Sequence, residues 1–416
     1  MSRQLLPLFV PALLIALLVA AAPTAAADDT TWYFGASPSH TNITFTSRTD
    51  LETIVGSTNA ISGSATADLG GGKLSGIDIR VPVASLRTGI DTRDEHLRSA
   101  NWLDAEKFAD ITFKATSGKK TSGNNWEITG EFGMHGKTKS MTITATVRAI
   151  PAALAARVNL GEGNWIRVQT SFPITLADYD VKVPGGLAPK VQGTWNVEIT
   201  ITGGTVAPPE AAAGPTSAAT TGEYNYPEVA LTGDGIHYKF GLRPQGTNIT
   251  VVSKTDIETV ITQTNQIHGE ALVNAPGKTG SVKLYVPVMA LRTGIGARDG
   301  HLQSEAWLDA KKNPFIIFES TSATPAGYLK WDITGNITLH GVTKPLTVQV
   351  EMRIVGPEAL QKAGFAAADE FLTGVHFRTT FKLKLSDFGV TIPDVAVGKV
   401  NNEIDLTFEA LGIEQQ

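Results

Sequence analysis

The 416-residue sequence contains no cysteine, which excludes disulfide bonds, thiolate nucleophiles, zinc fingers and iron–sulfur clusters held by cysteine. An excess of positive charge is also missing, because 35 Lys and Arg stand against 40 Asp and Glu. Broad electrostatic binding of nucleic acid is therefore not expected. Charged residues make up 18% and hydrophobic residues 42% of the chain, a composition typical of folded globular proteins.

Short motifs of catalysis and metal binding are absent as well. The 8 histidines show neither HxH nor HExxH spacing, so we expect no metal site and no cofactor. The sequence has no G-x-S-x-G motif, no phosphate-binding loop and no G-x-G-x-x-G opening a helix. These absences favour a protein that is not an enzyme.

One apolar run stands at the start of the sequence. Arg3 precedes an apolar stretch from Leu5 to Ala22, which is followed by Ala25-Ala26-Ala27. A positive start, an apolar middle and an A-x-A end are typical of a secretory signal peptide. We predict a signal peptide at residues 1–27, with an uncleaved anchor helix as the alternative. The mature protein is then expected to be periplasmic or secreted, with no further transmembrane segment.

A long internal repeat occupies most of the remaining sequence. VPVASLRTGIDTRDEHLRSANWLD at residues 81–104 returns as VPVMALRTGIGARDGHLQSEAWLD at residues 286–309, with 16 of 24 positions identical. The repeat is far longer than that of a solenoid, so it indicates a duplicated domain. We expect one domain at residues 28–202 and another at residues 224–416. A linker rich in Pro, Ala and Gly joins them at residues 203–223.

Apolar and polar residues mostly alternate within each copy. On one segment, for example, Ile77, Ile79 and Val81 alternate with Asp78 and Arg80. This period is typical of half-buried antiparallel strands. About seven or eight such strands in each copy indicate a sandwich or a closed barrel.

Signals for helices and turns are few. Residues 94–107 and 299–311 are each expected to form one short helix, and residues 151–157 and 357–363 a second one. Gly136 and Gly341, in the two His-Gly pairs between strand-like segments, fit hairpin turns that need a positive φ. A turn is the favoured interpretation of these pairs, and contact with a ligand head group is the alternative.

Polar residues that both copies retain gather in one loop. They are Thr88, Arg93, Asp94 and His96 in the first copy, and Thr293, Arg298, Asp299 and His301 in the second. Arginine offers a fork of donors to an anionic or carbonyl group, and histidine exchanges protons near neutral pH. The loop is therefore either a head-group site or an ion pair that fixes the start of a helix, with the aspartate near the helix N-terminus.

Together these motifs resemble the YceI-like family, the lipocalin-like polyisoprenoid-binding proteins of bacterial envelopes. The resemblance rests on Arg-Asp-x-His-Leu-x-Ser at residues 93–99 and 298–304, and on G-x-x-x-x-H-G-x-T-K at residues 130–139 and 335–344. It covers each copy almost from end to end. One departure is the family's early His-Ser pair, which is His40-Thr41 in the first copy but Gly246-Thr247 in the second. This departure predicts a different head-group end, particularly in the second copy.

The resemblance implies an all-β fold with two tandem eight-stranded antiparallel barrels, each with one or two short helices and an elongated apolar tunnel. It implies binding of a long-chain lipid of polyisoprenoid, quinone or fatty-acyl type. The candidate tunnel walls are Ile79, Val81, Phe113, Ile143, Val147, Val286, Phe318, Val348 and Val350. Two alternatives stay open: a structural or adhesive envelope protein with filled barrels, and an enzyme that uses the Arg-Asp-His loop on a lipid-like substrate.

Overall fold

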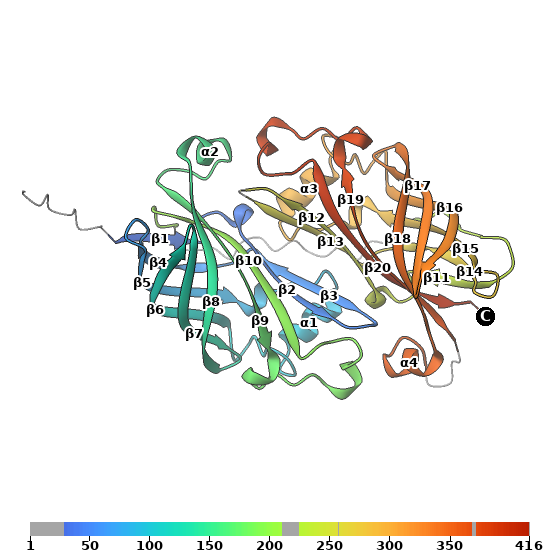
Figure 1. The fold of residues 1–416 in the computed structure, drawn as a ribbon, viewed down its shortest axis with the longest axis horizontal. Helices are drawn as coiled ribbons and strands as arrows, with labels where there is room; N and C mark the ends of the chain where they lie inside the picture. Colours follow the sequence, from blue (N-terminus) through green and yellow to red (C-terminus); the bar gives the residue numbers. More distant parts are fainter. Residues whose placement is uncertain (1–28, 210–223, 257, 368–371, 416) are drawn as a thin grey trace, which may run out of the picture.

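The computed structural model describes residues 29–209, 224–256, 258–367 and 372–415 (Figure 1). The expected signal peptide lies outside the described residues, as does most of the expected linker. Strand β10 ends at Gly204, so the first two residues of the expected linker belong to the sheet of the first domain.

Two ten-stranded antiparallel sheets make up the fold, one from each copy of the repeat. The first sheet consists of β1 (Thr30–Phe34), β2 (Asn42–Arg48), β3 (Thr53–Thr58), β4 (Ser62–Asp68), β5 (Lys73–Pro82), β6 (Asp110–Ser122), β7 (Asn125–Met134), β8 (Lys137–Ile150), β9 (Trp165–Thr175) and β10 (Thr194–Gly204). The second consists of β11 (Ile236–Phe240), β12 (Thr247–Lys254), β13 (Thr259–Thr264), β14 (His268–Asn274), β15 (Thr279–Pro287), β16 (Phe315–Gly327), β17 (Lys330–Leu339), β18 (Val342–Val355), β19 (Gly374–Lys384) and β20 (Glu403–Glu414).

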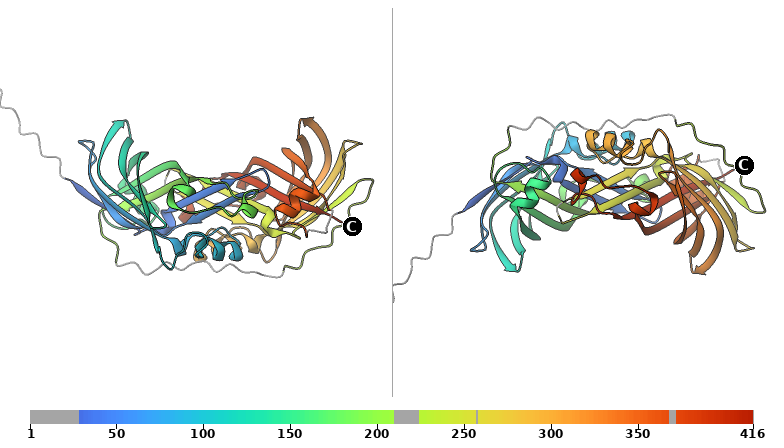
Figure 2. Two further views of the ribbon diagram at one scale, coloured as in Figure 1. Left: turned by 90° about the horizontal axis from the view of Figure 1, so that it is seen from below. Right: turned by 90° about the horizontal axis from the view of Figure 1, so that it is seen from above.

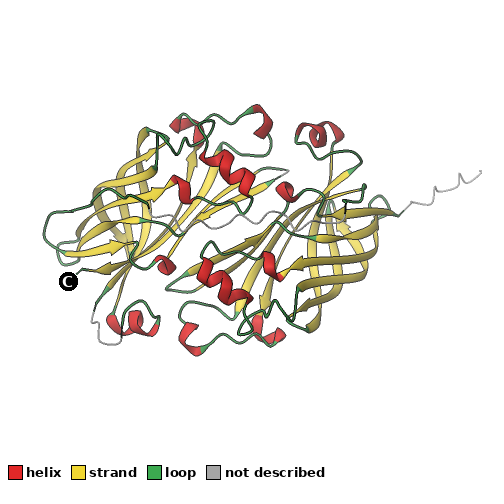
Figure 3. Ribbon diagram, turned by 180° about the vertical axis from the view of Figure 1, so that it is seen from behind, coloured by secondary structure: helices red, strands yellow, loops and turns green. Residues whose placement is uncertain are grey.

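Helices are short and lie outside the sheets (Figure 3). The α-helices are α1 (Asp91–Arg98), α2 (Ala152–Arg157), α3 (Gly296–Gln303) and α4 (Pro357–Lys362). Single 3-10 turns occur at Pro38–His40, Val83–Ser85, Leu176–Tyr179, Gly185–Leu187, Pro244–Gly246, Val288–Ala290, Leu385–Phe388 and Asp394–Ala396. Among the helices that the structure describes, none has the length and apolar character needed to cross a membrane.

Eight strands of each sheet close into a barrel. In the first domain β1 pairs with β4 on one side and with the end of β10 on the other. In the second domain β11 closes the ring in the same way between β14 and β20. The prediction of two tandem eight-stranded barrels is therefore confirmed. The two remaining strands of each sheet form a hairpin, β2–β3 or β12–β13. Strand β2 pairs with β10, and strand β12 pairs with β20.

The predicted alternation also holds. Ile77, Ile79 and Val81 on β5 all line the interior of the first barrel. Their neighbours Asp78 and Arg80 lie outside, where Lys114 on β6 forms an ion pair with Asp78 at 3.3 Å. One face of each strand is thus dry and the other wet, as the period of two requires.

The bounds predicted for the first helix of each copy are wrong. Helix α1 begins three residues before Asp94 and ends at Arg98, and α3 ends at Gln303. The chain leaves the helical path at Ser99 and turns back, so that the Leu103 N–H donates to the Leu97 carbonyl at 3.1 Å. This turn buries Leu103, whose side chain is 1% exposed. The second helix of each copy is at most one residue shorter than predicted.

Both His-Gly pairs form two-residue hairpin turns, as expected. His135 and Gly136 have φ angles of 50° and 72°, and His340 and Gly341 have 51° and 75°. Positive φ at both positions is the geometry of a type I′ turn. The His135 Nδ1 donates to the Tyr179 carbonyl at 2.9 Å, and the equivalent histidine approaches the Phe388 carbonyl at 3.3 Å. These histidines therefore tie the turn to a neighbouring loop.

The two domains meet through their hairpins β2–β3 and β12–β13, which lie side by side between the barrels (Figure 1). We call this contact region the seam. Arg378 on β19 donates to the Thr49 carbonyl at 2.8 Å, and Arg167 on β9 donates to the Thr255 carbonyl at 3.0 Å. Thr49 and Thr255 are equivalent in the repeat, so each domain holds the hairpin turn of the other. Helices α1 and α3 lie on the same side of the molecule (Figure 2).

The hairpin turns supply a test of the fold. An alanine at Gly136 would have to adopt a φ of 72°, and its Cβ would lie 2.5 Å from the Phe108 ring. At Gly341 the closest atom is the Asn313 side-chain oxygen at 2.9 Å, which is free to rotate away. We expect Gly136→Ala to lower the free energy of unfolding by about 2 kcal/mol and Gly341→Ala by about 1 kcal/mol. Urea unfolding measures both, and equal losses would contradict the role given to Phe108.

Candidate functional site

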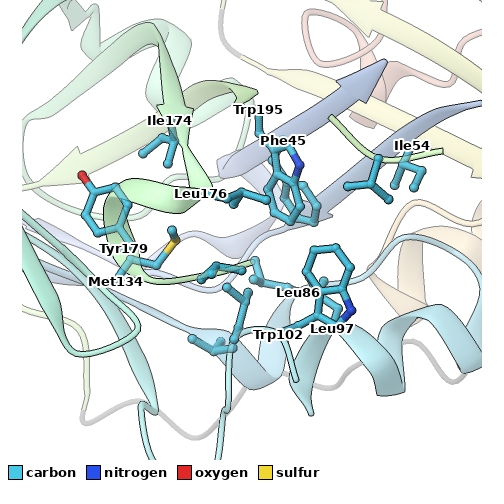
Figure 4. Close-up of a cluster of buried hydrophobic side chains, with 14 of the residues drawn as sticks. Phe45, Ile54, Leu86, Leu97, Trp102, Met134, Ile174, Leu176, Tyr179 and Trp195 are labelled. Carbon is cyan, nitrogen blue, oxygen red and sulfur yellow. The ribbon is translucent and has the colours of Figure 1, made fainter. Parts of the chain in front are cut away.

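An apolar cavity of about 180 Å³ lies inside the first barrel. Among its lining residues the polar ones are Thr44, Thr112 and Thr170. All the first-copy positions predicted as tunnel walls line it: Ile79, Val81, Phe113, Ile143 and Val147. Figure 4 shows the aromatic and aliphatic cluster at one end of this barrel, where Phe45, Trp195 and Trp102 face one another. The first barrel is therefore incompletely filled by its own side chains.

A second apolar cavity, of about 110 Å³, lies inside the second barrel. It is lined by the predicted wall residues Val286, Phe318, Val348 and Val350, and Thr379 is the polar residue of its lining. The second cavity also has Phe377 and Phe408 in its wall, where the repeat places Val168 and Ile199 in the first. The larger side chains offer a physical reason for the smaller volume.

The retained aspartates fix their own loop. Asp94 accepts two hydrogen bonds from Thr88, one from the backbone N–H and one from the hydroxyl, both at 2.6 Å. Asp299 accepts the same two bonds from Thr293, also at 2.6 Å. Asp94 is 2% exposed, and burial raises its pKa against the effect of these bonds. This geometry supports the structural interpretation of the loop for the Thr-Asp pair.

The retained arginines each meet a carboxylate that the loop motif did not predict. Arg93 Nη1 lies 2.5 Å from Glu52 Oε1, and Arg298 Nη1 lies 2.7 Å from Glu258 Oε1. Both glutamates are 4% exposed. Burial raises the pKa of each to about 7, although the neighbouring arginine opposes the shift. Their recurrence at equivalent positions of the repeat was the available signal in the sequence, but nothing in it placed them beside the arginines.

The histidines of the loop do not join the aspartates in an acid–base pair. Asp94 is bonded to Thr88 and Arg93 to Glu52, and His96 is exposed. His96 lines the same cavity as Arg93 and Glu52, but no hydrogen bond or ion pair joins it to Asp94 among the described residues. His301 is likewise exposed on the opposite copy. In the described part of the chain no group of three or more His, Asp and Glu is arranged to hold a metal ion.

A third cavity, of about 250 Å³, lies in the first domain at the seam, and we call it the seam pocket. It is lined from α1 and the loop before it, from the β2–β3 hairpin, from the segment 187–191 and by Gln245 of the second domain. Phe45 and Trp195 line both the seam pocket and the barrel cavity. Their rings stack with centroids 5.0 Å apart, so one aromatic pair separates the two cavities.

A family profile of the YceI-like domain matches residues 34–203 and 240–411. A UPF0312 protein of Pseudomonas aeruginosa is 34% identical over 134 residues, which cover 32% of this chain and 63% of the relative. Protein YceI of Salmonella newport is 33% identical over 137 residues, with coverages of 32% and 63%. The chain thus spans less than two thirds of the length of these relatives.

Solved structures with detectable likeness include BcnA of Burkholderia cenocepacia, at 20% identity and a TM-score of 0.35, covering 40% of this chain and 97% of that one. Another is a polyisoprenoid binding domain from Saccharophagus degradans, at 15% identity and a TM-score of 0.33, covering 42% and 99%.

The buried glutamates predict a pH-dependent stability. Glu52 has a pKa of about 7 in the folded protein, against an ordinary value of 4.5. Its contribution to the free energy of unfolding is therefore full below about pH 4.5 and is lost as the pH rises through 7. Glu258 acts in the same direction. His40 acts in the opposite direction, because burial lowers its pKa from 6.5 to about 4 and its contribution is lost as the pH falls through 4.

We therefore expect Glu52→Gln to change how stability varies between pH 5 and pH 7.5. The loss of unfolding free energy over this rise in pH should shrink by about 1–3 kcal/mol relative to the parent protein. Urea unfolding at the two pH values measures it. Glu127→Gln, at an exposed ion pair with Lys119, is the matched control and should leave the profile unchanged. A Glu52→Gln profile identical to that of the parent would contradict the raised pKa.

Proposed function

Because the chain belongs to the YceI-like family and carries two copies of its domain, we propose that it is an exported protein that sequesters or carries a long-chain apolar lipid in its barrels. The lipid is of polyisoprenoid, quinone or fatty-acyl type. The observation that carries this proposal is the apolar cavity inside each closed barrel. The signal-peptide pattern at residues 1–27 supports a periplasmic or secreted location.

The cavities suit a chain of methylenes or isoprene units. Each buried CH₂ contributes roughly 0.8 kcal/mol, so ten of them give about 8 kcal/mol before ordering costs. That corresponds to a dissociation constant on the order of 1 μM. A single hydrogen bond to the head group adds only about 0.5–1.5 kcal/mol. The tail therefore sets the affinity, and polar groups at the end of the barrel select the head.

The two alternatives have less support. A structural protein with filled barrels does not need a cavity of about 180 Å³ in the first barrel and one of about 110 Å³ in the second. An enzyme based on the Arg-Asp-His loop needs these groups to converge on a substrate. Instead Asp94 is bonded to Thr88 and Arg93 to Glu52.

Filling a barrel with a larger side chain tests the proposal. Ile143 on β8 lines the first cavity, and its equivalent Val348 on β18 lines the second. We expect Ile143→Trp to abolish uptake of hexadecanol by the first barrel and Val348→Trp to abolish uptake by the second, so that each variant binds one equivalent fewer than the parent. Isothermal titration calorimetry counts the equivalents.

The matched control is Thr144→Trp, since Thr144 is the exposed neighbour of Ile143 on the same strand. This variant should bind hexadecanol like the parent. If Ile143→Trp and Thr144→Trp bound the same amount as the parent, the first barrel would not be the binding site.

A further inference from the structure

The seam pocket combines apolar walls with an uneven charge. Its aromatic walls are Phe45, Trp102 and Trp195. Arg93 and Lys190 line it as cations, and Glu52 lines it as the acidic group. Glu52 is engaged with Arg93, and burial raises its pKa to about 7, so near neutrality it carries less than a full negative charge. Two half-buried cations and one carboxylate next to an apolar wall suit an anion attached to an apolar group.

Lys190 is the cation without a carboxylate partner. Its Nζ lies 4.0 Å from the centroid of the Phe365 ring of the second domain, a cation–π contact across the seam. Within the described residues no carboxylate lies within ion-pair distance of this nitrogen, and burial lowers its pKa. The carboxylate that acts on the pKa of Lys190 is that of Glu52, which already accepts a hydrogen bond from Arg93. The ammonium therefore retains hydrogen-bonding capacity toward the pocket.

The equivalent place in the second domain is occupied. There Glu258, Arg298 and Lys399 repeat the set of Glu52, Arg93 and Lys190. His40 of the first domain lies against it, with its Nε2 3.9 Å from Glu258 Oε2. His40 is 2% exposed, and its Nδ1 lies 2.6 Å from the Ser37 hydroxyl. Because burial lowers its pKa to about 4, it fills this place as a neutral ring.

The repeat replaces His40 by Gly246. At the place of His40 the second copy thus has a glycine, whose neighbour Gln245 lines the open pocket. A Cβ at Gly246 would meet the Leu411 and Phe365 side chains of its own domain. The same backbone carries an imidazole toward the second domain and no side chain toward the first. The pocket is open beside Arg93, whereas the His40 side chain packs beside Glu258 and Arg298.

We propose that the seam pocket binds the oxyanion head group, a phosphate or a carboxylate, of an amphipathic ligand, and that only the first domain has this site because Gly246 leaves open the place that His40 fills in the second. The proposal rests on the proposed lipid-binding function. The apolar part of the ligand contacts the seam-pocket wall of Phe45, Trp102 and Trp195, and its head lies between Arg93 and Lys190. The two domains therefore differ in the head group that they accept.

Titration of the full mature chain with dodecyl phosphate, dodecanol and inorganic phosphate separates head from tail. We expect dodecyl phosphate, below its micelle concentration, to bind one site at least tenfold more tightly than dodecanol, because a charge-assisted hydrogen bond is added. Inorganic phosphate should bind far more weakly than dodecyl phosphate. Equal affinity for dodecyl phosphate and dodecanol would overturn the head-group site while leaving the proposed function intact, and binding of neither would contradict the proposed function itself. Tight binding of inorganic phosphate would overturn the lipid assignment.

Lys190→Gln and Lys399→Gln form a matched pair of variants at equivalent positions. The preference for dodecyl phosphate should fall about tenfold in Lys190→Gln and persist in Lys399→Gln, while both variants bind dodecanol like the parent. A preference that survives Lys190→Gln, or that Lys399→Gln removes equally, would overturn the assignment to the first domain.

The variant His40→Gly is an independent test of the proposal. The equivalent residue of the second copy is Gly246, so the backbone accepts a glycine at this place. It should add a second phosphate-preferring site that Lys399→Gln then removes. No second site in a folded His40→Gly protein would overturn the role given to His40.

Discussion

Closure of each sheet on itself is the constraint on which the rest of the structure depends. The pairing of β1 with β10, and of β11 with β20, leaves the eight strands of each ring without a free edge. Every second residue of these strands must then face a closed interior, where an unpaired polar group would be costly. The interior is accordingly apolar, and eight strands enclose a volume that side chains barely fill or leave partly empty. The cavities are the part left empty.

The duplication adds a second level of organisation. Each copy extends a hairpin past its barrel, and the two hairpins pack together so that residues with the same place in the repeat face different surroundings. Arg167 and Arg378 hold the opposite hairpins by bonds to the backbone carbonyls of Thr255 and Thr49 and to the hydroxyls of Thr259 and Thr53. Other positions near the seam differ between the copies, as His40 and Gly246 do.

Local patterns predicted local structure well. The His-Gly pairs form tight turns because positive φ is a property of the turn itself, and the alternating residues of β5 and β8 face the barrel because a period of two leaves no other choice. The family resemblance supplied what periodicity does not, namely closure of the sheet into a barrel. The helix at residues 94–107 was misplaced because its helical pattern continues past Ser99, whereas the chain turns there to bury Leu103.

Contacts between residues far apart in the chain could not be predicted from the sequence. Glu52 lies 41 positions from Arg93, and no local pattern indicates that a strand end and a helix meet there. The seam pocket draws on both domains, and its opening depends on the packing of one copy against the other. The sequence did indicate that the second copy differs at Gly246, and the consequence for the head group stays a prediction.

The central claim is that the barrels hold a long-chain lipid. Organic extraction of the protein purified from the organism that produces it, followed by mass spectrometry, tests it most directly. The account predicts a long-chain lipid in stoichiometric amount, at one or two molecules per chain. A protein that yields no lipid, and that takes up neither added quinone nor polyprenyl phosphate, would contradict it.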